Sequence, residues 1–262
     1  MINNMFENKN ALVCGSTDGI GKATATLLAQ RGAEIILLAR NKEKLISTIG
    51  DLSINSGQNH RYVCADFDDP SGLKEAVKDQ VSDYEKPIHI LINNSGGPHG
   101  GPLIEAEENE FRIAFERLLI CNHILAKEVV PRMKEIKYGR IINIISTSVK
   151  QVIKGLGVSN TIRGSVAQWA KTLALELGEF GITVNNVLPG YTKTNRLDEL
   201  ALKNANFEGK TIEQIFNSWS SNNSVNRIGD TKEIAESVAF LASDSSGFIN
   251  GHDLVVDGGR FR

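Results

Sequence analysis

Short apolar runs rich in Val, Ile and Leu recur along this chain between longer stretches with helical spacing, and this alternation constrains its fold more than any other feature. Runs without polar alternation are typical of strands that crossover helices bury on both faces. The pattern predicts an α/β fold: a doubly wound, parallel sheet flanked by helices. The seven expected strands are Ala11–Cys14, Glu34–Leu38, Arg61–Ala65, Ile88–Ile92, Arg140–Ile145, Thr183–Leu188 and Asp253–Val256.

Amphipathic stretches between these strands predict helices. They lie at Ile20–Gln30, Leu73–Val81, Phe111–Met133, Gln168–Leu177 and Ile234–Leu241. No repeat and no Gly-, Ser- or Pro-rich linker interrupts the alternation, so residues 1–262 are expected to form one domain. The exception is Tyr191–Arg227, an Asn- and Ser-rich stretch that looks irregular. Long stretches of this kind in compact folds are more often functional than filler, so residues 191–227 are predicted to be a substrate lid.

Composition excludes several classes of protein. With 29 Lys and Arg against 31 Asp and Glu, the chain has no basic block that would attract a phosphate backbone, so nucleic acid is not an expected partner. No apolar run approaches the roughly 20 residues that span a bilayer, and residues 1–9 are too polar for a secretory signal, so a soluble, cytoplasmic protein is expected. Cys14, Cys64 and Cys121 are widely spaced in apolar stretches, which favours buried thiols over disulfides or a metal site.

The first predicted strand runs directly into a glycine-rich turn, and a predicted helix follows it. The turn reads Gly15-Ser16-Thr17-Asp18-Gly19-Ile20-Gly21. Glycines allow the backbone to approach a diphosphate closely, and the helix N-terminus presents unpaired N–H groups and the positive end of its dipole. Because the turn joins the first strand and first helix of an alternating chain, it predicts a dinucleotide-binding site.

The GxxxGxG spacing of this turn resembles that of the short-chain dehydrogenase/reductase family, and further motifs in the same order extend the resemblance along nearly the whole chain. Asp66 and Phe67 resemble the family's adenine-contacting position, and Asn93-Asn94-Ser95-Gly96 resembles its NNAG turn. The run from Gly139 to Ser146 resembles the strand that ends in the catalytic serine, and residues 251–259 resemble the last strand. Leu188-Pro189-Gly190 with Thr192 and Thr194 resembles the PG motif at the nicotinamide end. The resemblance implies a Rossmann-type NAD(P) domain with these residues at the cofactor.

The choice of cofactor depends on the end of the second predicted strand, Leu37-Leu38-Ala39-Arg40. No acid is present there to accept hydrogen bonds from the adenosine ribose and repel a 2′-phosphate. Arg40 instead offers a guanidinium fork that suits such a phosphate, although a solvated surface charge is the alternative. Asp18 argues the other way, because relatives that prefer NADP often carry a basic residue in this turn. NADP(H) is therefore the preferred cofactor, and NAD(H) stays possible.

The sequence departs from the family at the proton-transfer residues. The family's serine is kept as Ser146, but its spacing places Ser159 where the tyrosine is usual and Arg163 where the lysine is usual. The usual asparagine falls on Leu118, with Asn122 one turn further. A serine hydroxyl is a far weaker acid than a phenol, and guanidinium practically never deprotonates. The pattern resembles the atypical β-ketoacyl-reductase-like branch of the family, in which the cofactor site is kept and the tetrad is imperfect.

Hydride transfer also needs a group that stabilises the developing oxyanion and a source for a proton. Ser146 and Ser159 are candidates for a two-point oxyanion site, and Arg163 for holding the cofactor ribose or a substrate carboxylate. For the proton, the candidates are Lys150, His99 in the glycine-rich stretch 96–101, Tyr191, or a water. A solvated charge, a surface loop residue and a packing residue are the respective alternatives.

The leading hypothesis is an NAD(P)(H)-dependent oxidoreductase, a carbonyl reductase or alcohol dehydrogenase for a small polar oxo compound. Arg163, His99 and Lys150 favour an oxo acid or keto sugar acid. A 3-oxoacyl thioester is the alternative substrate that the resemblance implies. Conjugate reduction of an enone is also possible, because its proton goes to carbon and a phenol is less essential. Loss of the Tyr/Lys pair favours the alternative, a catalytically silent dinucleotide-binding protein with a regulatory or assembly role. Family members usually associate through two long helices and the last strand, so a homotetramer or homodimer is expected.

Overall fold

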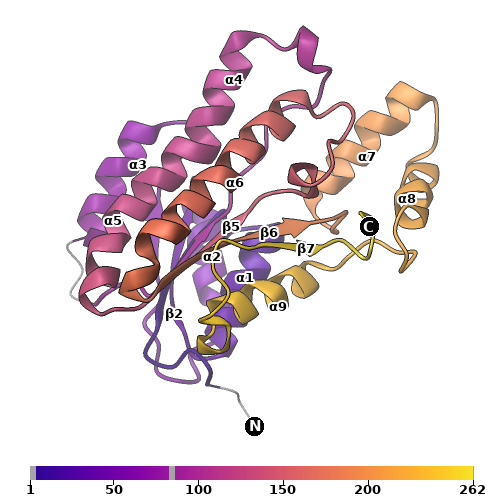
Figure 1. The fold of residues 1–262 in the computed structure, drawn as a ribbon. Coiled ribbons are helices and arrows are strands. Elements are labelled where there is room, and N and C mark those ends of the chain that lie inside the picture. The colour runs from indigo at the N-terminus through magenta and orange to yellow at the C-terminus, as the bar shows by residue number, and fades with distance from the viewer. Residues whose placement is uncertain (1–3, 83–85, 262) are drawn as a thin grey trace.

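The computed structural model describes residues 4–82 and 86–261 and confirms the predicted parallel sheet (Figure 1). Seven strands lie side by side in the order β3-β2-β1-β4-β5-β6-β7, and every neighbouring pair is parallel. The strands are β1 (Asn10–Cys14), β2 (Glu34–Ala39), β3 (Arg61–Cys64), β4 (Ile90–Asn93), β5 (Gly139–Ile144), β6 (Ile182–Pro189) and β7 (Asp253–Val256).

Helices connect the strands and cover both faces of the sheet. They are α1 (Gly19–Gln30), α2 (Lys42–Gly50), α3 (Pro70–Val77), α4 (Glu108–Phe115), α5 (Cys121–Glu135), α6 (Gly157–Leu177), α7 (Asn195–Glu208), α8 (Ile212–Ser221) and α9 (Thr231–Ala242). Single π-helical turns follow α3 (Lys78–Ser82) and join α4 to α5 (Glu116–Ile120). The 3₁₀ turns are Leu103–Glu105, Thr147–Val149, Gly178–Phe180 and Asp244–Ser246. None of the helices in the described ranges combines the length with the apolar composition of a membrane-spanning segment.

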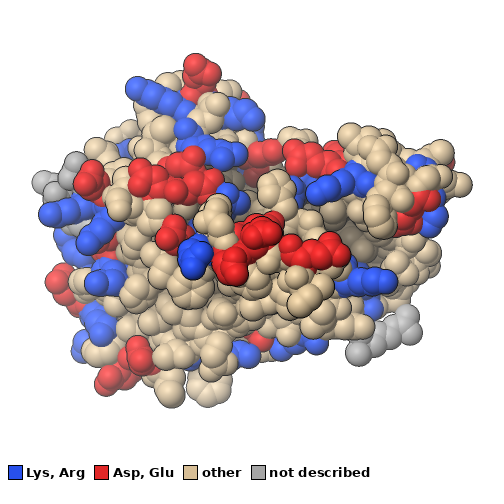
Figure 2. Space-filling view, turned by 90° about the horizontal axis from the view of Figure 1, so that it is seen from above, with Lys and Arg blue, Asp and Glu red and all other residues tan. Residues whose placement is uncertain are grey.

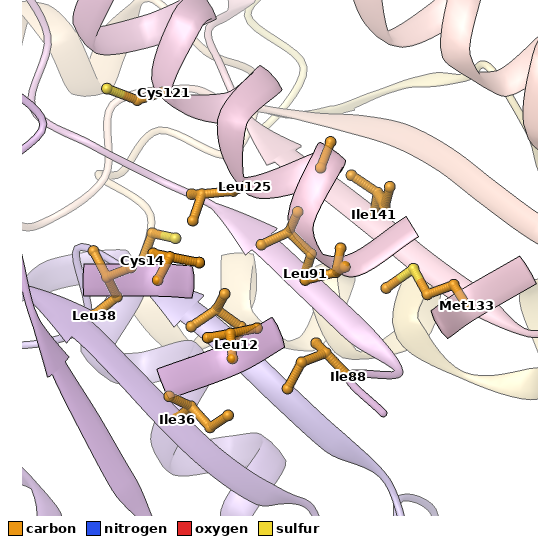
Figure 3. Close-up of a cluster of buried hydrophobic side chains, with 14 of the residues drawn as sticks. Leu12, Cys14, Ile36, Leu38, Ile88, Leu91, Cys121, Leu125, Met133 and Ile141 are labelled. Atoms are coloured by element: carbon orange, nitrogen blue, oxygen red, sulfur yellow. The ribbon is translucent and has the colours of Figure 1, made fainter. Parts of the chain in front are cut away.

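The core consists of two apolar layers, one on each face of the sheet, because successive strand residues point to opposite sides. Leu12 and Cys14 of β1 point into the layer beneath α3, α5 and α6, where they lie near Leu125 (Figure 3). Ala11 and Val13 of the same strand point into the layer beneath α1, α2 and α9. Strands that are apolar at every position are therefore buried on both faces, as their composition predicts.

Three sequence expectations are wrong in detail. Residues Tyr191–Arg227 are not irregular, because α7 and α8 occupy most of them and their apolar faces, including Ala201 and Trp219, pack against each other. The helix expected to begin at Gln168 begins at Gly157, since Val158, Ile162 and Val166 continue its buried face through a stretch of poor helix formers. Cys14 and Cys121 are buried as expected, whereas Cys64 is exposed on the edge strand β3.

The order in which the chain adds strands to the sheet reverses between β1 and β4, and this point positions the site. β1 pairs with β2 on one side and with β4 on the other. The chain leaves β1 for α1 on one face and leaves β4 for α4 and α5 on the other, so the two connections diverge (Figure 1). A crevice at the carboxyl ends of such strands is the usual ligand site of open α/β sheets. Seen from above, acidic and basic side chains are interspersed over the surface (Figure 2).

A row of buried amide side chains crosses four neighbouring strands. The Nδ2 of Asn93 donates to Oδ1 of Asn143 at 2.8 Å, and Nδ2 of Asn143 donates to Oδ1 of Asn186 at 2.9 Å. Asn186 in turn donates to Oδ1 of Asp253 at 2.8 Å. These residues are direct register partners on β4, β5, β6 and β7. Buried amides whose dipoles align in this way strengthen one another, and they fix the relative register of the strands.

Asp253 ends this row and binds two lysines with its other carboxylate oxygen. Lys150 Nζ lies 3.0 Å and Lys171 Nζ 3.1 Å from Oδ2, and the Asp253 side chain is almost fully buried. Burial opposes ionisation, but the hydrogen bonds from Asn186, Lys150 and Lys171 outweigh it and lower the pKa of Asp253. A carboxylate with a lowered folded-state pKa stabilises the fold above its unfolded-state pKa of about 3.9.

We expect Asp253→Asn to lower the free energy of unfolding at pH 7 by about 1–3 kcal/mol, because two charge-assisted hydrogen bonds are lost. The wild-type advantage should be lost as the pH falls from about 4 through the lower folded-state pKa. Urea unfolding at a series of pH values measures both effects. Asp51→Asn, which removes an exposed partner of Lys22 at 3.1 Å, is the control. Equal pH dependence of the two variants would contradict this account.

Candidate active site

The glycine-rich turn between β1 and α1 leaves backbone groups open at the helix N-terminus. Gly15 has a φ of +56°, and a Cβ there would lie 2.6 Å from Nδ2 of Asn94. At Gly21, a Cβ would overlap the carbonyl oxygen of Gly15. The Asn94 amide donates to the carbonyls of Cys14 at 3.2 Å and Gly15 at 3.4 Å, which fastens the end of β4 to the turn. This backbone geometry fits a dinucleotide diphosphate.

Two side chains of the turn are engaged in the protein's own structure. Ser16 is fully buried, and its hydroxyl donates to the carbonyl of Leu38 at 3.3 Å. Asp18 caps α1 through the N–H of Gly19 at 2.7 Å and accepts a second hydrogen bond from Nδ2 of Asn195 at 2.7 Å. Thr17 and Ile20 are partly buried. The turn therefore offers a phosphate mainly its backbone N–H groups.

The residues predicted to bind adenosine lie at the ends of β2 and β3. Arg40 is 72% exposed in its side chain, and its Nη1 lies 4.0 Å from Oδ2 of Asp66. Asp66 also accepts a hydrogen bond from the N–H of Asp68 at 3.0 Å. Phe67 is buried in the apolar layer beneath α3 and α5. The exposed pair of Arg40 and Asp66 is weak enough for Arg40 to turn toward a phosphate.

The PG segment after β6 lies beside the glycine-rich turn. Pro189 ends β6, and the N–H of Gly190 donates to the carbonyl of Val256 at 2.9 Å. Thr194 caps α7, and its methyl group lies 3.1 Å from the position that a Cβ of Gly19 would take. The hydroxyl of Thr192 is buried and donates to the carbonyl of Gly190 at 3.1 Å. On the other side of the crevice, Asn93 is buried, Ser95 is partly buried and Gly96 is exposed.

The three residues predicted to occupy the family's catalytic positions converge at the end of β5. Ser159 and Arg163 lie one turn apart on α6, and Nε of Arg163 donates to Oγ of Ser159 at 3.3 Å. Nη1 of Arg163 donates to the carbonyls of Ile145 at 2.8 Å and Ile144 at 3.3 Å. Ser146 follows directly, and its Oγ accepts the N–H of Ser148 at 3.1 Å. The guanidinium thus joins α6 to the strand that carries Ser146.

Burial lowers the pKa of Arg163 to about 10, and the positive charge of Arg196 contributes to this shift. The guanidinium is therefore charged at neutral pH. Within residues 4–82 and 86–261, no Asp or Glu forms an ion pair with Arg163. The site consequently carries a fixed positive charge next to the Ser159 hydroxyl, on the guanidinium that donates to it.

Two of the proposed proton donors have other partners. The ammonium of Lys150 binds the carboxylate of Asp253 on β7. Tyr191 is stacked on Trp219, with ring centroids 4.7 Å apart, and the guanidinium of Arg260 lies 4.1 Å from its centroid. Burial raises the pKa of Tyr191 despite the nearby Arg260 charge. These surroundings favour an ion pair for Lys150 and a packing role for Tyr191.

His99 and Asn122 differ in their exposure to solvent. His99 is exposed on the loop after β4, next to Pro98. Asn122 is buried on α5 just after the π-helical turn, which itself holds Leu118. Asn122 and Arg163 line a small cavity together with Asn93, whose Oδ1 has no hydrogen-bond partner in the described structure. A water in this cavity would find an acceptor in Asn93.

Sequence reasoning did not identify Arg196 as a site residue. Arg196 lies on the first turn of α7, and its Nη2 donates to the carbonyl of Pro98 at 3.1 Å. The signal was its place two residues after Thr194 of the PG motif. Arg196 reaches Pro98 because α7 begins at Asn195, and the Asn-rich composition of this segment gives no indication of that helix.

The family model described as Enoyl-(Acyl carrier protein) reductase matches residues 15–260. This match spans the glycine-rich turn, the serine strand and the PG motif in one alignment. The chain belongs to the short-chain dehydrogenase/reductase family. Members of this family are NAD(P)-dependent oxidoreductases, and the open backbone at Gly15–Gly21 of this member fits such a cofactor.

Curated relatives match this member of the family over nearly their whole length. The 3-oxoacyl-[acyl-carrier-protein] reductase of Vibrio cholerae is 34% identical and covers 98% of both chains. The (2S)-[(R)-hydroxy(phenyl)methyl]succinyl-CoA dehydrogenase subunit BbsD of Thauera aromatica is 32% identical and covers 97% of both. Among solved structures, L-sorbose reductase of Gluconobacter frateurii, complexed with NADPH and L-sorbose, aligns with a TM-score of 0.91 at 27% identity and covers 98% of both chains.

We expect Gly21→Ala to abolish detectable dinucleotide binding, because its methyl group would displace the carbonyl of Gly15 and the backbone N–H groups that face the diphosphate. Tryptophan fluorescence titration with NADPH measures binding, and circular dichroism checks that the variant is folded. Gly50→Ala on α2 is the control, since nothing lies within 4 Å of its Cβ position. A folded Gly21→Ala variant with wild-type affinity would refute this role of the turn.

Proposed function

We propose that this protein is an NADP(H)-dependent reductase of a small polar oxo compound, such as an oxo acid or keto sugar acid. In this proposal it belongs to the atypical branch in which Ser159 and Arg163 replace the family's tyrosine and lysine. The observation that carries the proposal is the direction of the hydrogen bonds at two hydroxyls. Ser159 accepts from Arg163, and Ser146 accepts from the N–H of Ser148. Each hydroxyl proton is therefore left to donate to a substrate oxygen.

Two O–H donors at one oxygen form an oxyanion site. A nicotinamide held at the glycine-rich turn would supply the hydride to the carbonyl carbon, and the carbonyl oxygen would then carry negative charge. The hydroxyls of Ser146 and Ser159 stabilise that charge, and the Arg163 charge behind Ser159 strengthens its hydrogen bond. Neither serine nor guanidinium releases a proton readily at neutral pH.

The proton must therefore reach the product oxygen from another source. Lys150 is held by Asp253, and the raised pKa of Tyr191 makes its phenol a poorer acid. The exposed His99 and solvent water are the remaining candidates, and we favour water because no contact among residues 4–82 and 86–261 directs the His99 ring into the site. This arrangement also suits conjugate reduction, in which the proton goes to carbon. A 3-oxoacyl thioester is the alternative substrate, supported by the similarity to the Vibrio cholerae reductase.

A catalytically silent dinucleotide-binding protein is the second candidate. The specific observation in its favour is that Lys150 and Tyr191 are both engaged elsewhere, which leaves the site without a strong internal acid. Turnover separates the two proposals, because both require the cofactor to bind.

We expect Ser159→Ala and Ser146→Ala each to lower kcat/KM by about 10²- to 10³-fold, the usual effect of removing one oxyanion donor. Cofactor affinity should be unchanged. NADPH oxidation against oxo acids, keto sugar acids, aldehydes and 3-oxoacyl thioesters measures the activity. Ser165→Ala is the matched control on α6, since its hydroxyl donates to the Thr161 carbonyl. Tight NADPH binding with no turnover of any class would favour the silent protein instead.

We expect Arg40→Ala to weaken NADPH binding by roughly 10- to 100-fold, the cost of one charge-assisted contact to the 2′-phosphate. NADH affinity should not change, because NADH lacks that phosphate. Parallel fluorescence titrations with both cofactors provide the measurement. Arg40→Lys keeps the charge without the planar fork, so its affinity for NADPH should lie between those of the wild type and Arg40→Ala. An equal loss for NADPH and NADH would argue against a phosphate contact.

We also propose that copies of the chain associate as a homodimer or homotetramer. Large apolar side chains are exposed on the helices expected to form such contacts: Ile113 and Phe115 on α4, and Leu175 on α6, which is 88% exposed. Exposed apolar residues of this size on neighbouring helices are typical of association surfaces.

A further inference from the structure

Two guanidinium groups meet at the loop that follows β4. Arg196 donates from Nη2 to the carbonyl of Pro98 at 3.1 Å. At the preceding residue, Gly97, a Cβ would lie 3.2 Å from Nη2 of Arg163. Arg163 comes from α6 and Arg196 from α7, so segments far apart in the sequence bring the two cations to one place.

These cations have little negative charge to compensate them. Arg163 uses Nε for Ser159 and Nη1 for the two β5 carbonyls, while no hydrogen bond of its Nη2 occurs within the described ranges. Arg196 pairs with Glu199 at 3.5 Å, which lies one turn along the same helix and is exposed to solvent. Exposed pairs of this kind contribute little and exchange readily. An anion placed between the guanidinium groups would therefore be attracted by both positive charges, with little competition from the protein's own carboxylates.

The first turn of α7 is fixed on both sides, which holds Arg196 in position. Asn195 donates to Asp18 of the glycine-rich turn at 2.7 Å. Arg196 itself is bound to Pro98 on the opposite side of the crevice. Groups held in this way lose little conformational entropy when they bind a ligand.

We propose that Arg196 and the Nη2 of Arg163 bind the carboxylate of the substrate, so that the reductase acts on 2-oxo or 3-oxo acids. This inference rests on the proposed function and narrows its substrate class. In a guanidinium, Nε–H and one Nη2–H point along the same edge. Because Nε donates to Ser159, a carboxylate on Nη2 lies next to the oxygen that Ser159 binds. The carboxyl group must then be only one or two bonds from the reduced carbon.

The test uses small probes that bind without being reduced. Oxamate carries the carboxylate of a 2-oxo acid, and ethyl oxamate is its uncharged ester. Calorimetric titration into the protein saturated with NADP⁺ should show Arg196→Gln weakening oxamate binding by roughly 10- to 100-fold. Ethyl oxamate binding and the NADP⁺ affinity should not change. Arg196→Lys should recover part of the loss, and Lys203→Gln, which removes an exposed charge from the same helix, should have no effect.

Several results would overturn the inference. Oxamate binding that Arg196→Gln leaves intact, or an equal loss for oxamate and its ester, would remove the carboxylate contact. A loss confined to NADP⁺ would assign Arg196 to a cofactor phosphate. Failure of the wild type to bind oxamate, 2-oxobutyrate and 3-oxobutyrate at millimolar concentrations would also refute it. Because binding is measured without turnover, a silent protein that binds oxamate would overturn the proposed function and leave the anion subsite standing.

Discussion

The hydrogen bonds of Asn94 to the ends of β1 and the glycine-rich turn are the contact on which the site depends. They hold β4 against β1 at the point where the order of the strands reverses, and the chain then leaves these strands toward opposite faces. The resulting crevice exposes backbone N–H groups at the start of α1 on one side and the end of β5 on the other. The loops that carry the predicted cofactor residues follow the carboxyl ends of the strands along this edge of the sheet.

The row of amides from Asn93 to Asp253 ties the same crevice to the far edge of the sheet. Each amide donates toward the Asp253 carboxylate, so the aligned dipoles leave the Oδ1 of Asn93 as the acceptor end, in the cavity beside Arg163. Aligned hydrogen bonds polarise one another in a low dielectric. The ion pairs at β7 and the electrostatics next to the active site are thus parts of one connected network.

The sequence predicts the sheet and the conformation of the glycine-rich turn well, because both follow from local patterns. Val- and Ile-rich runs need two covered faces, and glycines at 15 and 21 admit no side chain. The Ser159 and Arg163 pair also follows from sequence spacing, since one helical turn brings them together. Arg196 could not be found in this way. Its helix is stabilised by packing of Leu197, Ala201 and Trp219 across α7 and α8, which the polar composition of the segment conceals.

The arginine at position 163 changes what the site can do, and a lysine there would not simply restore the family's chemistry. The guanidinium fork binds one hydroxyl and two carbonyl oxygens at once and still has Nη2 directed at Gly97, which a compact ammonium cannot match. A lysine would also face a serine, whose hydroxyl gains too little acidity from a neighbouring cation to act as the phenol does. Under the proposed function, Ser159 and Arg163 act as one pair, and the pair supplies a fixed positive charge in place of a proton relay. A fixed charge of this kind suits the substrate that we propose, an oxo compound that carries its own negative group and takes its proton from water.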